Sequence, residues 1–233
     1  MVIQSDPNRE MLLLAITHLE PLLDDIALLG GAAVGLLLTD PAAAPVRSTF
    51  DLDVIIEISS YPEYLLLEER LRALGFIQSA EDAIVCRWRV NHLIVDVMPT
   101  NEQILGFGNR WYGPALHNAK WVDIGSKHVR VVTAPFFLAT KLEAFHGRGQ
   151  GDYLGSRDME DIIALVDGRP ELASEIQHGA SELRSYLQVE ISNLLSSTGF
   201  LEAIPGHLLP DEASQQRRTQ ILERLRNIVD SAL

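Results

Sequence analysis

Two aspartates at the start of an apolar strand constrain this chain more than any other feature of its sequence. Asp51 and Asp53 are separated by one residue and lead directly into Val54-Ile55-Ile56. Side chains two positions apart on a strand point to the same face, so these carboxylates are expected to lie close together. Carboxylates at that distance repel each other, and a hard divalent cation such as Mg²⁺ or Mn²⁺ relieves the repulsion. The pair therefore predicts a metal site where a strand begins.

A pair of glycines precedes these acids in the chain. Gly30 and Gly31 follow the apolar run 26–29 and open a second apolar segment. Because glycine has no Cβ, a phosphate group can approach the backbone N–H groups at the start of a helix. Taken alone, the pair is equally typical of a plain strand-to-helix turn. Together with the acids, it predicts a site for a nucleoside triphosphate and its metal.

A third acid interrupts the apolar run that is predicted as a strand over 93–98. Burying the lone carboxylate of Asp96 is costly unless it is paired or bound to a metal. If this strand lies beside the first, three carboxylates converge, and Asp96 binds a second metal or helps to draw the proton from an attacking hydroxyl. The alternative is a structural ion pair of Asp96 with Arg87 or Arg89 across a hairpin. The first two acids have a similar alternative, as a cap at the end of their strand.

Composition narrows the class of protein. The 233 residues are 47% hydrophobic and 22% charged, which is typical of a soluble globular chain of one large or two small domains. The formal net charge of −13 argues against generic binding to nucleic acid through an excess of positive charge. Cys86 is the single cysteine, so no intrachain disulfide forms, and a buried structural role is favoured over a nucleophilic one. Without a signal-peptide pattern or a long apolar segment, we expect a cytoplasmic protein that does not engage a membrane.

Strands and helices are predicted to alternate up to residue 132, with helices alone after it. The predicted strands are 26–29, 52–58, 83–90, 93–98, 121–124 and 128–132. The predicted helices are 11–20, 32–38, 61–74, 134–145, 156–166, 170–178, 181–196 and 211–233. Asn91-His92 and Gly125-Ser126 are predicted as tight hairpin turns. The pattern predicts an α/β (α+β) fold, with a mixed-sheet core over 1–132 and a helical region over 133–233 packed on that core.

Charged residues recur on two of the later helices. Lys141 and Arg148 are seven residues apart, so they share a helix face if the helix extends that far. A cationic face would neutralise a triphosphate as charge moves to the leaving pyrophosphate, whereas the alternative is a solvated face. Asp158 and Asp161 are three residues apart on the next helix. We expect them to position Lys141 or Arg148 by ion pairing, and the alternative is contact with the acceptor substrate.

The order of these motifs resembles the nucleotidyltransferase superfamily with the polymerase-β-like core. Within it, the chain is most similar to the AbiEii/MenT-type nucleotidyltransferases, the toxin halves of bacterial toxin–antitoxin pairs. The resemblance covers about residues 26 to 167 and is carried by Gly30-Gly31-Ala32, Arg47-x-Thr49-x-Asp51-x-Asp53, Asp96, Lys141-x-x-Ala144-x-x-x-Arg148 and Arg157-Asp158-x-x-Asp161. One departure is Arg157, which stands where the family often has lysine and presents a different donor geometry to phosphates. A second is the Ala- and Pro-rich loop between Leu38 and Arg47.

The resemblance implies Mg²⁺-dependent transfer of a nucleoside monophosphate from an NTP to an acceptor hydroxyl, with release of pyrophosphate. The acceptor it implies is a tRNA 3′ end or a protein, and a small antitoxin protein is the implied partner. The implied roles are metal binding and catalysis for Asp51, Asp53 and Asp96, phosphate binding for Gly30, Gly31, Arg47, Thr49, Lys141 and Arg148, and support for Asp158 and Asp161.

Two other functions fit the same motifs. Aminoglycoside nucleotidyltransferases share a glycine pair and a DxD-type motif, and a net charge of −13 suits a polycationic small molecule. The arginines and lysines gathered in the middle of the chain favour an anionic or protein acceptor instead. A catalytically silent nucleotide-binding module is the third possibility, and the presence of all three acids argues against it.

Overall fold

The computed structural model describes residues 6–79, 82 and 84–230, and these form two compact units. Residues 6–33 and 47–133 form what we call the sheet unit. Residues 34–46 and 134–230 form the helical unit.

The segment 34–46 departs from the predicted division at residue 132, because it belongs to the helical unit. Hydrogen bonds hold it there. The backbone N–H groups of Thr39 and Asp40 both donate to the carbonyl oxygen of Gly168, at 2.8 and 2.9 Å. The Nη2 atom of Arg217 donates to the carboxylate of Asp40 at 2.8 Å. Partners more than 120 residues away in sequence thus decide where this segment packs, and such partners leave no local signal.

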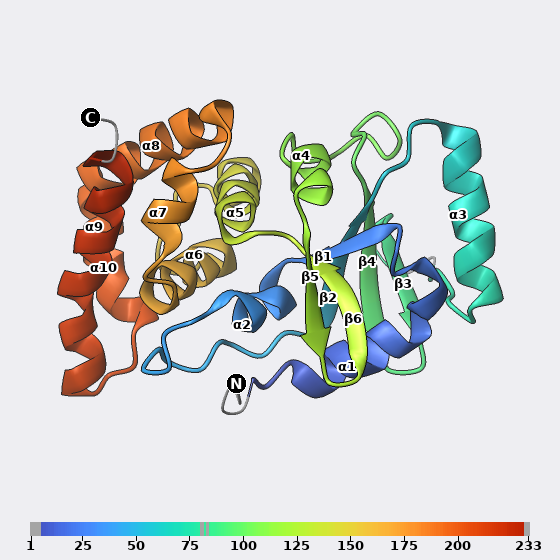
Figure 1. The fold of residues 1–233 in the computed structure, drawn as a ribbon, viewed down its shortest axis with the longest axis horizontal. Helices are drawn as coiled ribbons and strands as arrows, with labels where there is room; N and C mark the ends of the chain where they lie inside the picture. The colour runs from blue at the N-terminus through green and yellow to red at the C-terminus, as the bar shows by residue number, and fades with distance from the viewer. Residues whose placement is uncertain (1–5, 80–81, 83, 231–233) are drawn as a thin grey trace. The chain divides into compact units, whose positions relative to one another are not determined.

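The sheet unit is built on a six-stranded mixed sheet (Figure 1). The strand order is β3-β4-β2-β1-β6-β5. The strands are β1 (Ile26–Leu29), β2 (Asp51–Ile56), β3 (Arg87–Val90), β4 (Leu93–Pro99), β5 (Lys120–Ile124) and β6 (Lys127–Val131). β1 pairs antiparallel with β2 and parallel with β6, while β2 pairs parallel with β4. The sheet and its helices confirm the predicted α/β fold class.

Both predicted hairpins are present, β3–β4 and β5–β6. Their turns contain Asn91 and Gly125, with φ of 54° and 65°, in the left-handed region that asparagine and glycine tolerate. β3 begins at Arg87, later than the predicted strand 83–90, whose first residue lies outside the described residues. The chain turns just before β3, where the backbone N–H of Arg87 donates to the carbonyl oxygen of Ile84 at 3.2 Å.

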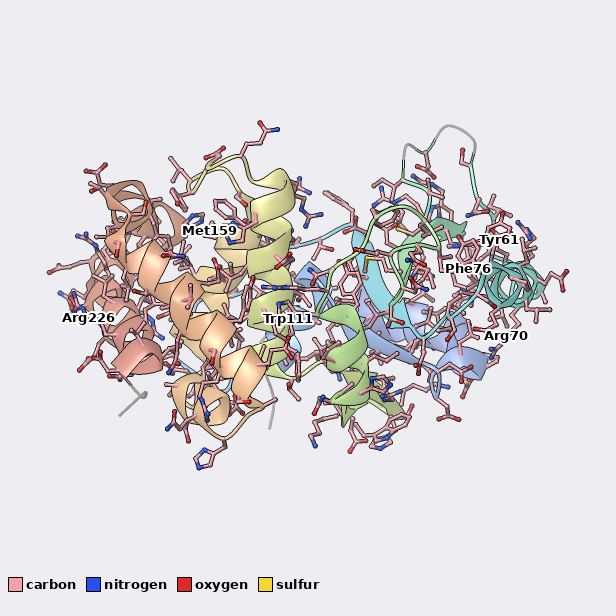
Figure 2. All side chains as sticks on the ribbon, turned by 90° about the horizontal axis from the view of Figure 1, so that it is seen from above. Tyr61, Arg70, Phe76, Trp111, Met159 and Arg226 are labelled. Atoms are coloured by element: carbon pink, nitrogen blue, oxygen red, sulfur yellow. The ribbon has the colours of Figure 1, made fainter. Side chains whose placement is uncertain are left out.

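Three helices and two 3₁₀ turns complete the sheet unit. They are α1 (Arg9–His18), η1 (Glu20–Leu22), η2 (Gly31–Ala33), α3 (Tyr61–Ala73) and α4 (Tyr112–His117). α1 packs against β4 and β6. α3 ends at Ala73, one residue before the predicted end at Leu74, and the predicted stop residue Gly75 has φ of 86°. Figure 2 shows the buried Phe76 beside α3 on the side toward the sheet. α4 was not predicted, because its six residues include a glycine and a proline that hide any helical period.

Alternation along β2 and β4 gives the sheet two chemically different faces. Leu52, Val54 and Val95 are fully buried on one face. Trp88 of β3 lies on that face too, and the Arg72 guanidinium of α3 sits 5.5 Å from its ring centroid. The opposite face carries the aspartates of β2 and β4. One face therefore packs into the core, while the other carries the aspartates followed by the buried Ile55 and Met98.

The helical unit consists of α2 (Val34–Leu37), α5 (Ala134–Arg148), α6 (Arg157–Gly168), α7 (Leu172–Gln177), α8 (Ser181–Ser196), α9 (Thr198–Ala203), η3 (Ile204–His207) and α10 (Glu212–Asp230). The helices predicted from residue 134 onward are confirmed, except that residues 231–233 of the predicted helix 211–233 lie outside the described residues. The short α9 was not predicted. The predicted helix over 32–38 is split between η2 and α2. Figure 2 shows Met159 inside this unit and Arg226 at its surface. Of the helices formed by residues 6–79, 82 and 84–230, none combines the length and apolar character needed to cross a bilayer.

Candidate active site

The three predicted acids share one face of two neighbouring strands. β2 and β4 run parallel, and their register pairs Asp53 with Asp96 and Asp51 with Ile94. Paired residues on parallel strands point to the same face, so the side chains of Asp53 and Asp96 are neighbours and Asp51 lies one pleat along β2. Asp96 is 6% exposed, whereas the Asp51 side chain is 37% exposed. The structure thus places one acid at the bottom of the cluster and another at its rim.

Arg87 neutralises part of this negative charge from the adjacent strand β3. It lies opposite Asp96 in the hairpin register. Its Nε donates to Oδ1 of Asp96 at 2.8 Å, and its Nη2 donates to Oδ2 of Asp96 at 2.7 Å and to Oδ2 of Asp51 at 2.8 Å. The hydrogen bonds to Asp96 hold the pKa of Arg87 above its ordinary value. Of the two arginines considered for an ion pair with Asp96, the structure selects Arg87, because Arg89 binds Asp82 through two hydrogen bonds of 2.8 and 2.7 Å.

The glycine pair lies directly against the acids. Gly30 has φ of 72°, and a Cβ at this position would come within 2.7 Å of the Cβ of Asp53 and overlap its carboxylate. This close approach follows from the pairing of β1 with β2, which places Leu29 opposite Asp53. Both the backbone conformation and the lack of space therefore require glycine at position 30.

The remaining predicted residues of this unit surround the same point. A Cβ on Gly31 would meet the guanidinium of Arg47 and come within 3.3 Å of Cγ2 of Thr49, so both side chains lie over the turn. The hydroxyl of Thr49 donates to the carbonyl oxygen of Asp51 at 2.7 Å. An arginine, a hydroxyl and the glycine backbone are groups that bind phosphate, and here they adjoin the carboxylates.

Asn8 is a site-supporting residue that the sequence did not reveal. It is 1% exposed, and its amide Nδ2 donates to the carbonyl oxygen of Arg47 at 3.0 Å. Its Oδ1 accepts from the backbone N–H of Thr49 at 2.9 Å. Asn8 precedes α1 but makes no side-chain capping bond to that helix. Its local sequence suggests an N-cap, and only the fold shows that it clamps a segment about 40 residues away.

Cys86 lies behind the acids and is 2% exposed, which confirms the predicted burial. Burial raises the pKa of its thiol to about 12, and the negative charges of Asp96 and Asp53 act in the same direction. The thiolate is therefore a minor species at neutral pH, so a nucleophilic role is disfavoured.

The donor chemistry of the three aspartates fits a divalent cation, because carboxylate oxygens are the ligands that Mg²⁺ and Mn²⁺ prefer. Within residues 6–79, 82 and 84–230, no group of three or more His, Cys, Asp or Glu side chains is arranged to hold a metal ion as it stands. The guanidinium of Arg87 binds oxygens of both Asp51 and Asp96. The cluster is thus chemically suited to a cation, and part of it is engaged by a cation of the protein itself.

The later charged residues form a cluster of their own in the helical unit. α5 continues through Arg148, so Lys141 and Arg148 share a helix as predicted. The Nζ atom of Lys141 lies 3.1 Å from Oδ1 of Asp158 and 2.6 Å from Oδ2 of Asp161. Arg148 donates to both oxygens of Asp158 at 2.8 Å. The predicted ion pairing is present, and its role in supporting a triphosphate stays a prediction.

Burial distinguishes the two cations of this cluster. The side chain of Lys141 is 8% exposed and that of Arg148 is 71% exposed. The alternative of a solvated face is therefore wrong for Lys141. Although burial acts to raise the pKa of Asp158, the hydrogen bond from Arg148 and the charge of Lys141 outweigh it and hold that pKa below its ordinary value.

Comparisons with known proteins bear on the fold. No protein-family model matches this chain, and none of the curated proteins matches it. Among solved structures, the chain is similar to the crystal structure of an antigenic nucleotidyltransferase-like protein from Paracoccidioides brasiliensis. The TM-score is 0.54 at 20% sequence identity, and the match covers 90% of this chain and 97% of that chain.

This fold is nucleotidyltransferase-like. The likeness concerns the fold, and it covers 90% of this chain. The finer resemblance to AbiEii/MenT-type enzymes stays a prediction.

Proposed function

We propose that this chain is a nucleotidyltransferase that moves a nucleoside monophosphate from an NTP to an acceptor hydroxyl. The observation that carries the proposal is the pairing of Asp53 with Asp96 on one sheet face, with Asp51 one pleat away and the Gly30 turn against Asp53. Three carboxylates beside a glycine turn with an arginine over it combine the two needs of this chemistry, a cation site and a phosphate site. The nucleotidyltransferase-like fold of the solved neighbour supports the same reaction class.

The reaction assigns a role to each residue. The acceptor oxygen attacks the α-phosphorus, the bond from that phosphorus to the bridging oxygen breaks, and pyrophosphate leaves with that oxygen. Asp51, Asp53 and Asp96 would hold Mg²⁺ or Mn²⁺, which supplies charge neutralisation and lowers the pKa of the attacking hydroxyl. Asp96 is the carboxylate to which we assign the proton of the acceptor hydroxyl. Arg47, Thr49 and the backbone at Gly30 and Gly31 bind phosphate oxygens.

Incubation of the purified protein with each α-labelled NTP, Mg²⁺, total bacterial RNA and lysate tests the reaction class. We expect label on an acceptor with the wild type and none with Asp53→Asn. The matched control is Asp82→Asn, because Asp82 pairs with Arg89 and is not one of the three acids. Equal labelling by wild type and Asp53→Asn would overturn the proposal.

The acceptor we propose is a tRNA 3′ end or a protein side chain, with the chain acting as the toxin of a toxin–antitoxin pair. The support is the motif order that joins the DxD acids to Lys141, Arg148 and Asp158-x-x-Asp161. The same labelling experiment separates the acceptors, because RNA and protein products differ in their sensitivity to ribonuclease and protease. Labelling of an aminoglycoside panel instead would assign the small-molecule reaction.

A catalytically silent nucleotide-binding module is the second candidate, and one observation favours it. Arg87 satisfies oxygens of Asp51 and Asp96 with three hydrogen bonds, as a structural ion pair would. This candidate expects the wild type to bind an NTP with no transfer to any acceptor. Binding measured by equilibrium dialysis alongside the labelling experiment distinguishes the two.

A further inference from the structure

We propose that Arg87 is a built-in counter-cation that competes with the divalent metal for Asp51 and Asp96. The inference rests on the proposed function, because it concerns the metal on which that reaction depends. It adds a residue that controls when the carboxylates become available.

The contacts of Arg87 are those expected of a group standing in for a metal ion. Its guanidinium reaches both oxygens of Asp96 and one oxygen of Asp51, all at 2.7 to 2.8 Å. It therefore bridges two of the three acids and not just its cross-strand partner. A metal ion needs lone pairs on the same carboxylates, so the guanidinium and the metal compete for these oxygens.

The charges around Arg87 explain why a cation is needed there. Three aspartates share this face of β2 and β4, and Asp53 lies beside Asp96 in the register. Without a nearby positive charge, these carboxylates would repel one another. Arg87 supplies that charge, and the raised pKa caused by its bonds to Asp96 shows how strongly the acids stabilise it.

The position of Arg87 also allows it to leave. Its side chain is 15% exposed and binds Asp51, which is itself 37% exposed at the rim. A long side chain at such a position can withdraw toward solvent without opening the core. Arg89, two residues along the same strand, instead pairs with Asp82 through two hydrogen bonds of 2.8 and 2.7 Å. The chain thus provides an internal control on the same strand face.

Competition makes a quantitative prediction for metal affinity. Only the molecules in which Arg87 has withdrawn from the acids can bind the metal. The apparent dissociation constant of the metal is therefore the intrinsic constant divided by the fraction of such molecules. Hydrogen bonds between charged groups are strong enough to keep that fraction at about one in ten or lower. Removing the guanidinium should therefore tighten metal binding by about tenfold or more.

The test is a Mn²⁺ titration of the full chain, followed by electron paramagnetic resonance of free Mn²⁺, without nucleotide. We expect Arg87→Met to bind Mn²⁺ at least about tenfold more tightly than wild type, and Arg89→Met to match wild type. A triple variant that adds Asp51→Asn and Asp53→Asn to Arg87→Met should lose the tighter Mn²⁺ binding. That loss would show that the additional affinity for Mn²⁺ depends on these acids. Equal or weaker binding by Arg87→Met overturns the inference while leaving the proposed function intact.

A measurement on the wild type keeps the inference testable if Arg87→Met fails to fold. The Nε–Hε resonance of Arg87, assigned by nuclear magnetic resonance, is expected to shift and lose its protection from solvent exchange as Mg²⁺ is added. Metal binding that leaves this resonance unchanged overturns the competition. If neither wild type nor Arg87→Met binds Mn²⁺ at all, the inference and the metal dependence of the proposed function fail together.

Discussion

The two charged clusters of this chain differ in how their charges are paired and in how deeply they are buried, and we expect different roles from them. In the helical unit, Lys141 and Arg148 face Asp158 and Asp161, so two cations meet two acids. In the sheet unit, Asp51, Asp53 and Asp96 share one face, and Arg87 binds two of them, Asp51 and Asp96. We call the helical cluster the balanced cluster, because its buried acids pair with cations of the protein. We call the other the aspartate cluster, whose carboxylates on one face suit a divalent cation.

The largest effect is expected from breaking the balanced cluster. Lys141→Met leaves two buried carboxylates with less positive charge, and breaking a buried ion pair typically costs about 3–5 kcal/mol. Urea unfolding should show this loss in the free energy of unfolding. Arg148→Met is the control, because an ion pair whose cation is 71% exposed contributes about 1 kcal/mol or less. Similar losses for the two variants would contradict the assignment of Lys141 as the buried centre.

The aspartate cluster should respond differently. Asp53→Asn lowers the negative charge that Asp53 shares with Asp96 on this face, so we expect a smaller loss in the free energy of unfolding than for Lys141→Met. Nucleotidyl transfer should fall by at least about 100-fold, or roughly 2.7 kcal/mol of transition-state stabilisation, since even residues that only support metal ligands cost about 10–100-fold. Steady-state labelling and urea unfolding of the same preparation check both parts. A loss of stability equal to that of Lys141→Met would remove the distinction between the clusters.

A smaller effect should come from the turn beside the acids. Gly30→Ala introduces a left-handed alanine, which costs about 1–2 kcal/mol, and adds an overlap with the Asp53 carboxylate. Gly75→Ala is matched to it, since Gly75 also has positive φ but an added Cβ would lie 3.9 Å from Val90. The difference between the two variants in urea unfolding measures the close approach alone. Equal losses in the free energy of unfolding for the two variants would mean that the close approach of Gly30 to Asp53 contributes nothing to the effect of Gly30→Ala.

The smallest effect concerns pH and sharpens the view of the balanced cluster. The pKa of Asp158 is lowered from 3.8 by Arg148 and Lys141, so the unfolded state binds its proton first. Its contribution to stability is therefore complete above pH 3.8 and is lost as pH falls through the lower folded-state pKa. Unfolding free energies measured from about pH 5 down to about pH 3 should fall less steeply for Asp158→Asn than for wild type.

Asp167 on the same helix provides the control of opposite sign. Burial raises its pKa above 3.8 in spite of its hydrogen bond from Arg217. Its folded form binds the proton first, so it opposes the acid loss, and Asp167→Asn should make that loss steeper. The same slope in both variants would show that neither carboxyl governs the acid range.

The sequence gives correct expectations where the signal is local. Continuous apolar runs located β1 and β2, and Asn91 and Gly125 located the hairpin turns. The α/β fold class followed from the order of those elements. The short helices α4 and α9 were not predicted, because a helix of six residues is too short to show a helical period in its apolar residues.

The residues of the site divide in the same way. Sequence by itself determined the acids, the glycine turn and the likeness to a known order of motifs, because each is a short pattern whose geometry a strand or turn imposes. The tertiary structure alone decided that Arg87 and not Arg89 binds Asp96, and that Asn8 clamps the segment around Arg47 and Thr49. Such choices depend on which strands become neighbours and on their register. Charge pairing acts through space, so the position of a partner along the chain does not reveal it.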